Sequence, residues 1–177
     1  AAAIVFWGEN RIKSRVSYGE LYAEVSRLAQ ALRAIGVKPG DRVAGYMPNI
    51  PGTVIAMLAA ASIGATWSSC SPDFGVQGVL DRFGQIEPKV LFVADGYFYN
   101  EKTIDVLPRV RELMPRLPSV EKLVVVPYTQ PSPHLAGLER AVDVHAFMSP
   151  YRPRPIMFER LPFNHPLYIL YSSGTTG

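Results

Sequence analysis

Two spacings of hydrophobic residues alternate along the chain and predict helices separated by strands. Apolar residues recur at steps of three and four over residues 21–35 and at helical spacing over 76–86, as in amphipathic helices. Short apolar runs at 43–47, 90–93 and 123–126 predict strands, and the unbroken runs among them indicate burial on both faces, as in a parallel sheet. The pattern therefore predicts an α/β fold, with a doubly wound, mostly parallel sheet flanked by helices.

Local signals mark where the helices begin and end. Ser17 and Glu20 form an S-x-x-E capping box, and Gly36 suits the end of the same helix. Residues 48–51 supply a cap and a proline for a second helix, which is predicted to be buried because it has no polar face. Apolar spacing predicts another helix over residues 104–114.

The remaining segments are shorter and complete the predicted order. They are a strand pair at 4–7 and 12–16, a strand at 65–70, a short helix or strand within 138–148, and proline-rich connections at 128–133 and 149–155. No shift in composition divides the chain. We therefore expect residues 1–177 to form one incomplete α/β subdomain.

Composition limits the possible functions. Hydrophobic residues make up 48% of the chain, the net charge is +3, and the basic residues are scattered, which argues against nucleic-acid binding. The longest apolar stretch is too short for a membrane span. A single cysteine, Cys70, and the lack of a secretion-signal pattern favour a reducing, cytoplasmic setting.

Side chains that could bind metals or act as nucleophiles are sparse. His134, His145 and His165 are far apart in sequence and lack metal-ligand spacing with Cys70, so no metal site is predicted. Cys70 has no neighbouring base to activate it, which favours the role of a small buried hydrophobic residue.

The last residues of the chain combine a predicted buried strand with a loop of small hydroxyl residues. An aromatic and β-branched run at 167–171 leads into a loop whose backbone N–H groups and hydroxyls could wrap phosphate oxygens. The Walker A spacing is absent, and an ordinary surface loop is the alternative. The candidate phosphate-binding residues are Ser172, Ser173, Gly174, Thr175, Thr176 and Gly177.

Residues 168–177, Tyr-Ile-Leu-Tyr-Ser-Ser-Gly-Thr-Thr-Gly, resemble the signature loop of the AMP-forming acyl-CoA synthetase superfamily, which includes luciferases and peptide-synthetase adenylation domains. The resemblance implies that this loop holds the β- and γ-phosphates of ATP, with Mg²⁺, while a carboxylate is adenylated. In that superfamily the loop continues through a proline and a lysine, and a C-terminal domain carries the lysine used in adenylation. Catalytic residues are thus expected beyond Gly177.

Further segments narrow the resemblance. Residues 64–75, 80–83 and 85–89 are similar to the acetoacetyl-CoA synthetase branch, which implies acetoacetate, ATP and CoA as substrates. Residues 99–102 resemble that branch's Tyr-Asn-Gly-Lys segment, so Tyr99 and Lys102 are candidate CoA-binding residues. Glu101 replaces the glycine, and its negative charge weakens this assignment. A solvated surface role for Lys102 is equally consistent with the sequence.

The sequence is consistent with three functional hypotheses. The chain is expected to be an inactive part of an acetoacetate–CoA ligase whose remaining domains lie outside it. The alternatives are another short-chain acyl-CoA synthetase or adenylation domain, and a nucleotide-binding module without catalysis.

Overall fold

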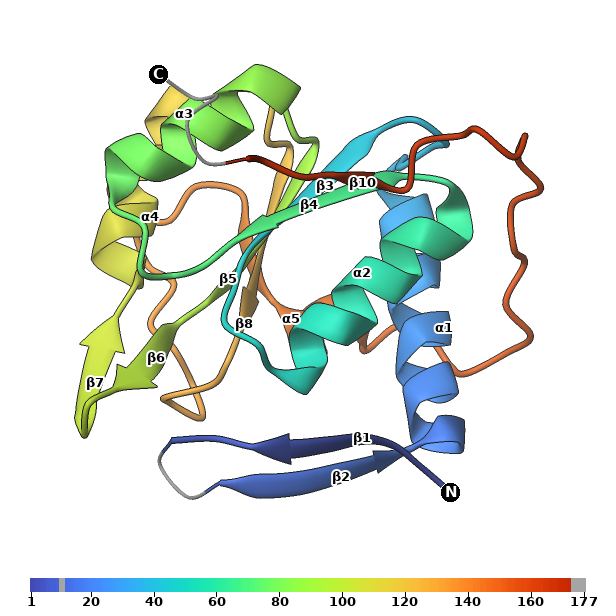
Figure 1. Ribbon diagram of the computed structural model, residues 1–177, viewed down its shortest axis with the longest axis horizontal. Coiled ribbons are helices and arrows are strands. Elements are labelled where there is room, and N and C mark those ends of the chain that lie inside the picture. The colour runs from blue at the N-terminus through green and yellow to red at the C-terminus, as the bar shows by residue number, and fades with distance from the viewer. Residues whose placement is uncertain (10–11, 173–177) are drawn as a thin grey trace.

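A six-stranded parallel sheet forms the centre of the computed structural model, which describes residues 1–9 and 12–172. The strand order is β10-β4-β3-β5-β8-β9, and every neighbouring pair is parallel. This architecture confirms the predicted α/β class (Figure 1). The strands are β3 (Arg42–Tyr46), β4 (Thr66–Cys70), β5 (Val90–Ala94), β8 (Lys122–Val126), β9 (Ala141–Asp143) and β10 (Tyr168–Ile169).

Helices cover both faces of the sheet and divide its core into two hydrophobic layers. Side chains of β5 alternate between the layers, because neighbouring residues of a strand point to opposite faces. In the described part of the chain, no helix has the length and apolarity that crossing a membrane requires. One layer contains α1 (Tyr18–Ala34), α2 (Pro51–Ile63) and α5 (Val144–Met148); the other contains α3 (Val76–Ile86), α4 (Leu107–Leu113) and the 3₁₀ turn η1 (Met114–Arg116).

The start of α1 is the capping box that the sequence predicts. The Glu20 backbone N–H donates to Ser17 Oγ at 3.2 Å, and the Ser17 backbone N–H donates to Glu20 Oε2 at 2.7 Å. The backbone hydrogen bond from Ser17 lowers the pKa of Glu20. Gly36 follows the helix with φ +87°, as a C-terminal glycine does.

Two antiparallel hairpins lie outside the main sheet. The first, β1 (Ala2–Trp7) with β2 (Lys13–Ser17), was predicted. The second, β6 (Gly96–Tyr99) with β7 (Lys102–Asp105), was not. The predicted helix start at 104 is therefore wrong, because Ile104 pairs with Tyr97 in the second hairpin and α4 begins three residues later.

Two burial predictions differ from the structure. The helix α2 has no exposed residue, but most of its fully buried residues, including Ala56, Ala59 and Ile63, share one face, and the other residues are half-buried. The N-cap residue Ile50, which precedes α2, makes no side-chain cap. The strand β10 is shorter than the predicted 167–171 and is not buried: Tyr168 is 47% accessible and Ile169 is half-buried, and Leu170, just after the strand, is 82% accessible. It is the edge of the sheet, where the described residues supply a partner on one side only.

A long irregular segment, residues 149–167, carries the chain from one edge of the sheet to the other around α1 and α2 (Figure 1). Its backbone is held by side chains of α1. Arg33 donates to Met157 O at 2.7 Å, and Ser26 Oγ donates to Arg154 O at 2.6 Å. These bonds guide the segment to the edge where β10 pairs with β4.

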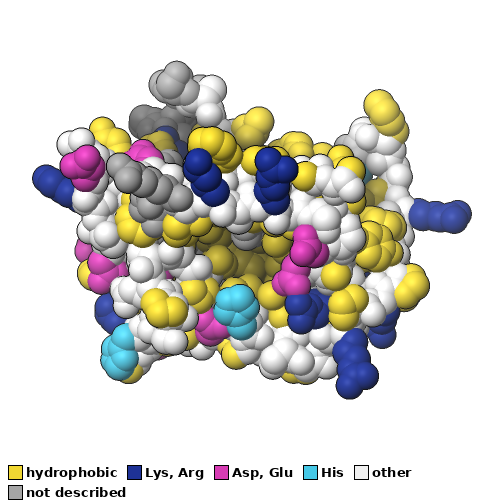
Figure 2. Space-filling model, turned by 90° about the horizontal axis from the view of Figure 1, so that it is seen from below, with side chains coloured by type: hydrophobic (Ala, Val, Ile, Leu, Met, Phe, Trp, Pro, Cys, Tyr) yellow, Lys and Arg dark blue, Asp and Glu magenta, His cyan; other side chains and the backbone are white. Residues whose placement is uncertain are grey.

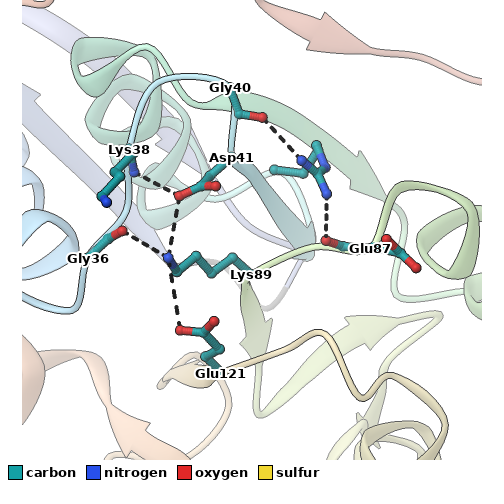
Figure 3. Close-up of polar contacts among 8 residues, drawn as sticks. Gly36, Lys38, Gly40, Asp41, Glu87, Lys89 and Glu121 are labelled. Carbon is teal, nitrogen blue, oxygen red and sulfur yellow. Dashed lines mark hydrogen bonds and ion pairs between the residues drawn. The ribbon is translucent and has the colours of Figure 1, made fainter.

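The amino ends of the strands are joined by polar contacts (Figure 3). Lys89 Nζ donates to Gly36 O at 2.9 Å and lies 3.6 Å from Asp41 Oδ2 and 4.0 Å from Glu121 Oε2. Asp41 also accepts a hydrogen bond from the Lys38 backbone N–H. Lys89 therefore connects the segments that precede β3, β5 and β8 at the amino edge of the sheet.

Candidate functional site at the carboxyl ends of the strands

A cavity of about 300 Å³ lies where the loops after β3, β4 and β5 meet. In the sheet, β4 lies beside β3 on one side and β5 lies beside β3 on the other, so the strand order reverses between β3 and β5. The cavity lies at this switch point. Open parallel sheets bind their ligands at this switch point. The cavity is lined by Phe6, Trp7, Gly8, Glu9, Pro48, Asn49, Ile50, Ser71, Pro72, Asp73, Tyr97, Phe98, Tyr99 and Tyr128.

Two other cavities have a different character. One, of about 340 Å³, lies between α1, α2 and the 149–167 segment and is largely apolar. Another, of about 130 Å³, has hydrophobic walls from α1, α2 and α5, with Glu24 and His145 among its lining residues. Figure 2 shows a hollow of this kind, hydrophobic within and bordered by a histidine and acidic groups. Neither lies at the switch point, so neither is the default ligand site.

The loop after β4, residues 71–75, is held by hydrogen bonds from two polar side chains, Tyr46 and Arg109. The buried Tyr46 hydroxyl lies within hydrogen-bond distance of the carbonyl oxygens of Pro72 and Phe74. Arg109 Nη1 donates to Pro72 O at 2.8 Å and to Tyr46 Oη at 3.4 Å. Burial raises the pKa of Tyr46, so its hydroxyl remains a donor at neutral pH. These hydrogen bonds hold this wall of the cavity in place.

Aromatic and acidic groups dominate the lining. Burial, followed by the hydrogen bond with Asp73, raises the pKa of Tyr97. Burial, followed by the charge of Glu9, raises the pKa of Tyr128. Both phenols therefore stay neutral at physiological pH. A ligand with a flat, uncharged portion suits these walls, and any phosphate groups would need to lie away from the two carboxylates.

The candidate CoA-binding residues lie apart from the described start of the candidate phosphate-binding loop. Tyr99 lines the cavity and is 60% exposed, whereas Lys102, its partner in the hairpin, is exposed and does not line the cavity. Ser172 follows β10 at the carboxyl edge of the sheet, where the cavity also lies. In the sheet, β10 is three strand spacings from β5, or roughly 14 Å. The other predicted phosphate-binding residues, 173–177, lie outside the described residues.

The structure gives no support for chemistry at Cys70. The thiol is buried, and burial raises its pKa to about 12, the opposite of what a nucleophile requires. His165 Nε2 lies 2.8 Å from Gly64 O, a contact that ties the 149–167 segment to the end of α2. Within residues 1–9 and 12–172, no three His, Cys, Asp or Glu side chains are grouped so that they could hold a metal ion.

Sequence reasoning missed several residues of the cavity. Asn49, Asp73, Phe98 and Tyr128 were not singled out, although each lies in or near the segment that follows a predicted strand. The rule that parallel sheets bind ligands at strand carboxyl ends could have found Asn49 and Asp73. Phe98 and Tyr128 depend on the unpredicted hairpin and on packing between distant segments.

A parallel sheet with a cavity at its switch point is an architecture of nucleotide-using enzymes, and comparison with known families agrees. The family model described as "AMP-binding enzyme" matches residues 1–177, so the chain belongs to this family. Its relatives include acetoacetyl-coenzyme A synthetase of Rhizobium meliloti (strain 1021), which is 55% identical over 176 residues, 99% of this chain and 27% of that protein. Acetoacetyl-CoA synthetase of Xenopus tropicalis is 47% identical over 169 residues, 92% of this chain and 25% of that protein.

A solved structure has the same fold. Acetoacetyl-CoA synthetase from Streptomyces lividans matches 99% of this chain with a TM-score of 0.90 at 43% sequence identity. The match covers 26% of that chain. The present chain thus spans about a quarter of the length of the relatives it matches.

Proposed function

We propose that this chain is part of an ATP-dependent, AMP-forming acid–thiol ligase, an acetoacetate–CoA ligase. The reaction joins acetoacetate to AMP with release of pyrophosphate, and the thiol of CoA then displaces AMP to give acetoacetyl-CoA. The observation that carries the proposal is 55% identity to an acetoacetyl-coenzyme A synthetase over 99% of the chain. Residues 1–177 form an incomplete α/β part of the N-terminal domain in this proposal, and a cytoplasmic setting stays a prediction.

Membership of an AMP-binding family implies ATP as the nucleotide substrate. In the proposal, residues 172–177 bind its β- and γ-phosphates. Their backbone N–H groups and hydroxyls would stabilise the departing pyrophosphate, because fixed donors need no reorganisation as charge develops. The parallel pairing of β10 with β4 supports this role, since it brings Ser172 to the carboxyl edge of the sheet.

Mg²⁺ is expected to arrive with the nucleotide. The described residues contain no group of three side chains that could hold a metal ion, so they do not fit a resident magnesium site. Mg²⁺ commonly binds through substrate phosphates with one or two carboxylates.

CoA is proposed to bind at the cavity beside Tyr99. The aromatic lining suits a purine ring, and Lys102 at the surface could pair with a phosphate that the acidic lining disfavours. Because the two residues face each other in the β6–β7 hairpin, one ligand could contact both.

The proposal is tested by ATP–pyrophosphate exchange with the complete protein that contains this chain. Acetoacetate, acetate and longer acids are compared as substrates, because the acid pocket is expected outside residues 1–177. Preference for acetoacetate supports the ligase assignment. Preference for another acid supports a different acyl-CoA synthetase or adenylation domain, and no exchange with any acid supports a nucleotide-binding module. The 177-residue chain alone is the matched control and should show no exchange.

The phosphate loop has its own test. Replacing Thr175 or Thr176 by valine keeps the branched shape and removes one hydroxyl donor. Loss of one donor to the developing charge should slow adenylation about a hundredfold or more. Thioester formation from pre-made acyl-adenylate should be largely unchanged, because pyrophosphate has already left. Equal defects in both half-reactions, or none, would show that the loop does not hold pyrophosphate.

A further inference from the structure

Asp95, the residue after β5, is a fully buried carboxylate that is surrounded by donors from one distant loop. It is 0% exposed and accepts hydrogen bonds from the backbone N–H groups of Tyr128, Thr129 and Gln130 at 2.6, 3.0 and 2.8 Å. The Thr129 hydroxyl adds a fourth bond at 2.8 Å. Such a bond to a charged acceptor is about twice as strong as a neutral one. Asp95 therefore fixes the loop that follows β8 to the end of β5.

Gly96, the residue after Asp95, leaves room for the contact with Thr129. A Cβ atom at position 96 would lie 2.8 Å from Thr129 Oγ1 and 2.5 Å from Ile104 O, so only glycine fits. The lack of a side chain at Gly96 thus leaves room for the Thr129 side chain against the β6–β7 hairpin.

The loop carries an aromatic wall of the candidate site. The Tyr128 ring packs edge-on against Phe98, with centroids 5.2 Å apart, and against Phe6 at 6.2 Å. All three residues line the cavity at the switch point, and they come from β1, β6 and the loop after β8. The position of Tyr128 in this wall depends on the backbone that Asp95 holds.

We propose that Asp95 is a positioning residue for CoA binding, acting through Tyr128 on the aromatic wall that receives the flat part of the ligand. This inference rests on the proposed CoA site. Asp95 does not line the cavity, and its effect on CoA passes through the Tyr128 backbone.

The test uses the complete enzyme and three variants. Tyr128→Ala removes the aromatic ring from the cavity wall. Asp95→Asn replaces one accepting oxygen by an amide NH2 group, which cannot accept a hydrogen bond. Thr129→Val removes a single hydrogen bond and is the milder variant, to be used if Asp95→Asn is unstable. The KM for CoA is measured in thioester formation, and ATP–pyrophosphate exchange is measured in parallel. We expect Tyr128→Ala and Asp95→Asn each to raise the KM for CoA about tenfold, as loss of one stacking contact does. Thr129→Val should raise it less, and exchange per folded molecule should not change.

A double variant separates positioning from general destabilisation. If Asp95 acts through Tyr128, combining Asp95→Asn with Tyr128→Ala raises the KM for CoA no further than either change alone. Ser26→Ala is the matched control, because Ser26 is also buried and holds a distant segment but does not line the cavity. It should lower stability and leave the KM for CoA unchanged.

The outcomes distinguish the two proposals. If Tyr128→Ala raises the KM for CoA while Asp95→Asn and Thr129→Val do not, the cavity binds CoA and the positioning role of Asp95 is wrong. If Tyr128→Ala has no effect on that KM, the cavity is not the CoA site and both proposals fail. A multiplicative increase in the double variant also overturns the inference.

Discussion

Tyr99 and Lys102 face each other as the last pair of the β6–β7 hairpin, so the two candidate CoA-binding residues are joined by a two-residue turn. The turn residues Asn100 and Glu101 both have positive φ, 48° and 62°. Asparagine tolerates this conformation and glycine favours it, whereas a glutamate there is strained. The glycine that the family resemblance leads one to expect is therefore also the residue that the backbone favours.

Replacing Glu101 by glycine should stabilise the protein by about 0.5–1 kcal/mol, because it relieves the positive φ. It should also lower the KM for CoA by removing a negative charge beside the proposed site. Urea unfolding and thioester kinetics measure the two effects. Glu101→Gln is the control, since it removes the charge and keeps the strained backbone. Equal stabilisation by glutamine would show that charge, not backbone strain, is the cause.

Replacing Lys89 by methionine should destabilise the protein by about 1–2 kcal/mol. The change removes a charged donor to Gly36 and leaves Asp41 without its ion-pair partner, both at a partly buried site. The midpoint of urea denaturation measures the loss. Lys38→Met is the matched control, because its side chain is exposed and only its backbone contacts Asp41. A comparable loss in both variants would contradict a special role for Lys89.

Replacing Tyr46 by phenylalanine should cost about 1–3 kcal/mol of stability, since it leaves the partly buried Phe74 carbonyl without its hydroxyl donor. The loop after β4 should also become more accessible to hydrogen exchange, while Arg109 still holds Pro72. Exchange monitored by mass spectrometry tests this. Tyr18→Phe, at a tyrosine that is 65% exposed, should change neither quantity. Unchanged exchange of residues 71–75 in Tyr46→Phe would exclude the bracing role.

The thiol of Cys70 should resist alkylation at pH 8 in the folded protein. It is buried, and its pKa of about 12 leaves almost no thiolate at that pH. The reaction with iodoacetamide should therefore proceed through unfolding and accelerate in urea. Rapid modification without loss of structure would contradict the observed burial.

The same raised pKa predicts a pH dependence of stability. The unfolded thiol ionises near its ordinary value of 9.0 and the folded thiol only near 12, so the unfolded state loses its proton first. This contribution is fully present below pH 9 and is lost as the pH rises toward 12. Cys70→Ala should flatten the fall in stability over this window, measured as the difference between the two proteins. An unchanged slope would show that other groups account for it.

Much of the fold could be predicted because its signals are local. The capping box of α1 involves residues three positions apart, and β5 and residues 123–126 of β8 are unbroken apolar runs that are typical of buried strands. The alternation of such strands with helices leaves few topologies other than a doubly wound sheet. The family resemblance is likewise contained in short contiguous segments.

The candidate site was predictable only in part. Tyr99 was identified by resemblance and lies in the cavity wall. The contribution of Tyr128 could not be predicted, since it depends on hydrogen bonds to Asp95, a residue 33 positions earlier. Periodicity also failed at Ile104, because its spacing fits a helix while its partner Tyr97 makes it a strand residue.

By itself, the sequence determined the type and order of most elements, the parallel sheet and the family, because each follows from neighbours along the chain or from a contiguous motif. Only the tertiary structure decided the β6–β7 hairpin, the exposure of β10 and the cavity at the switch point. These features depend on which distant segments pack together. The free energy of burial is set by the neighbours that remove water from a side chain, and the chain order does not specify them.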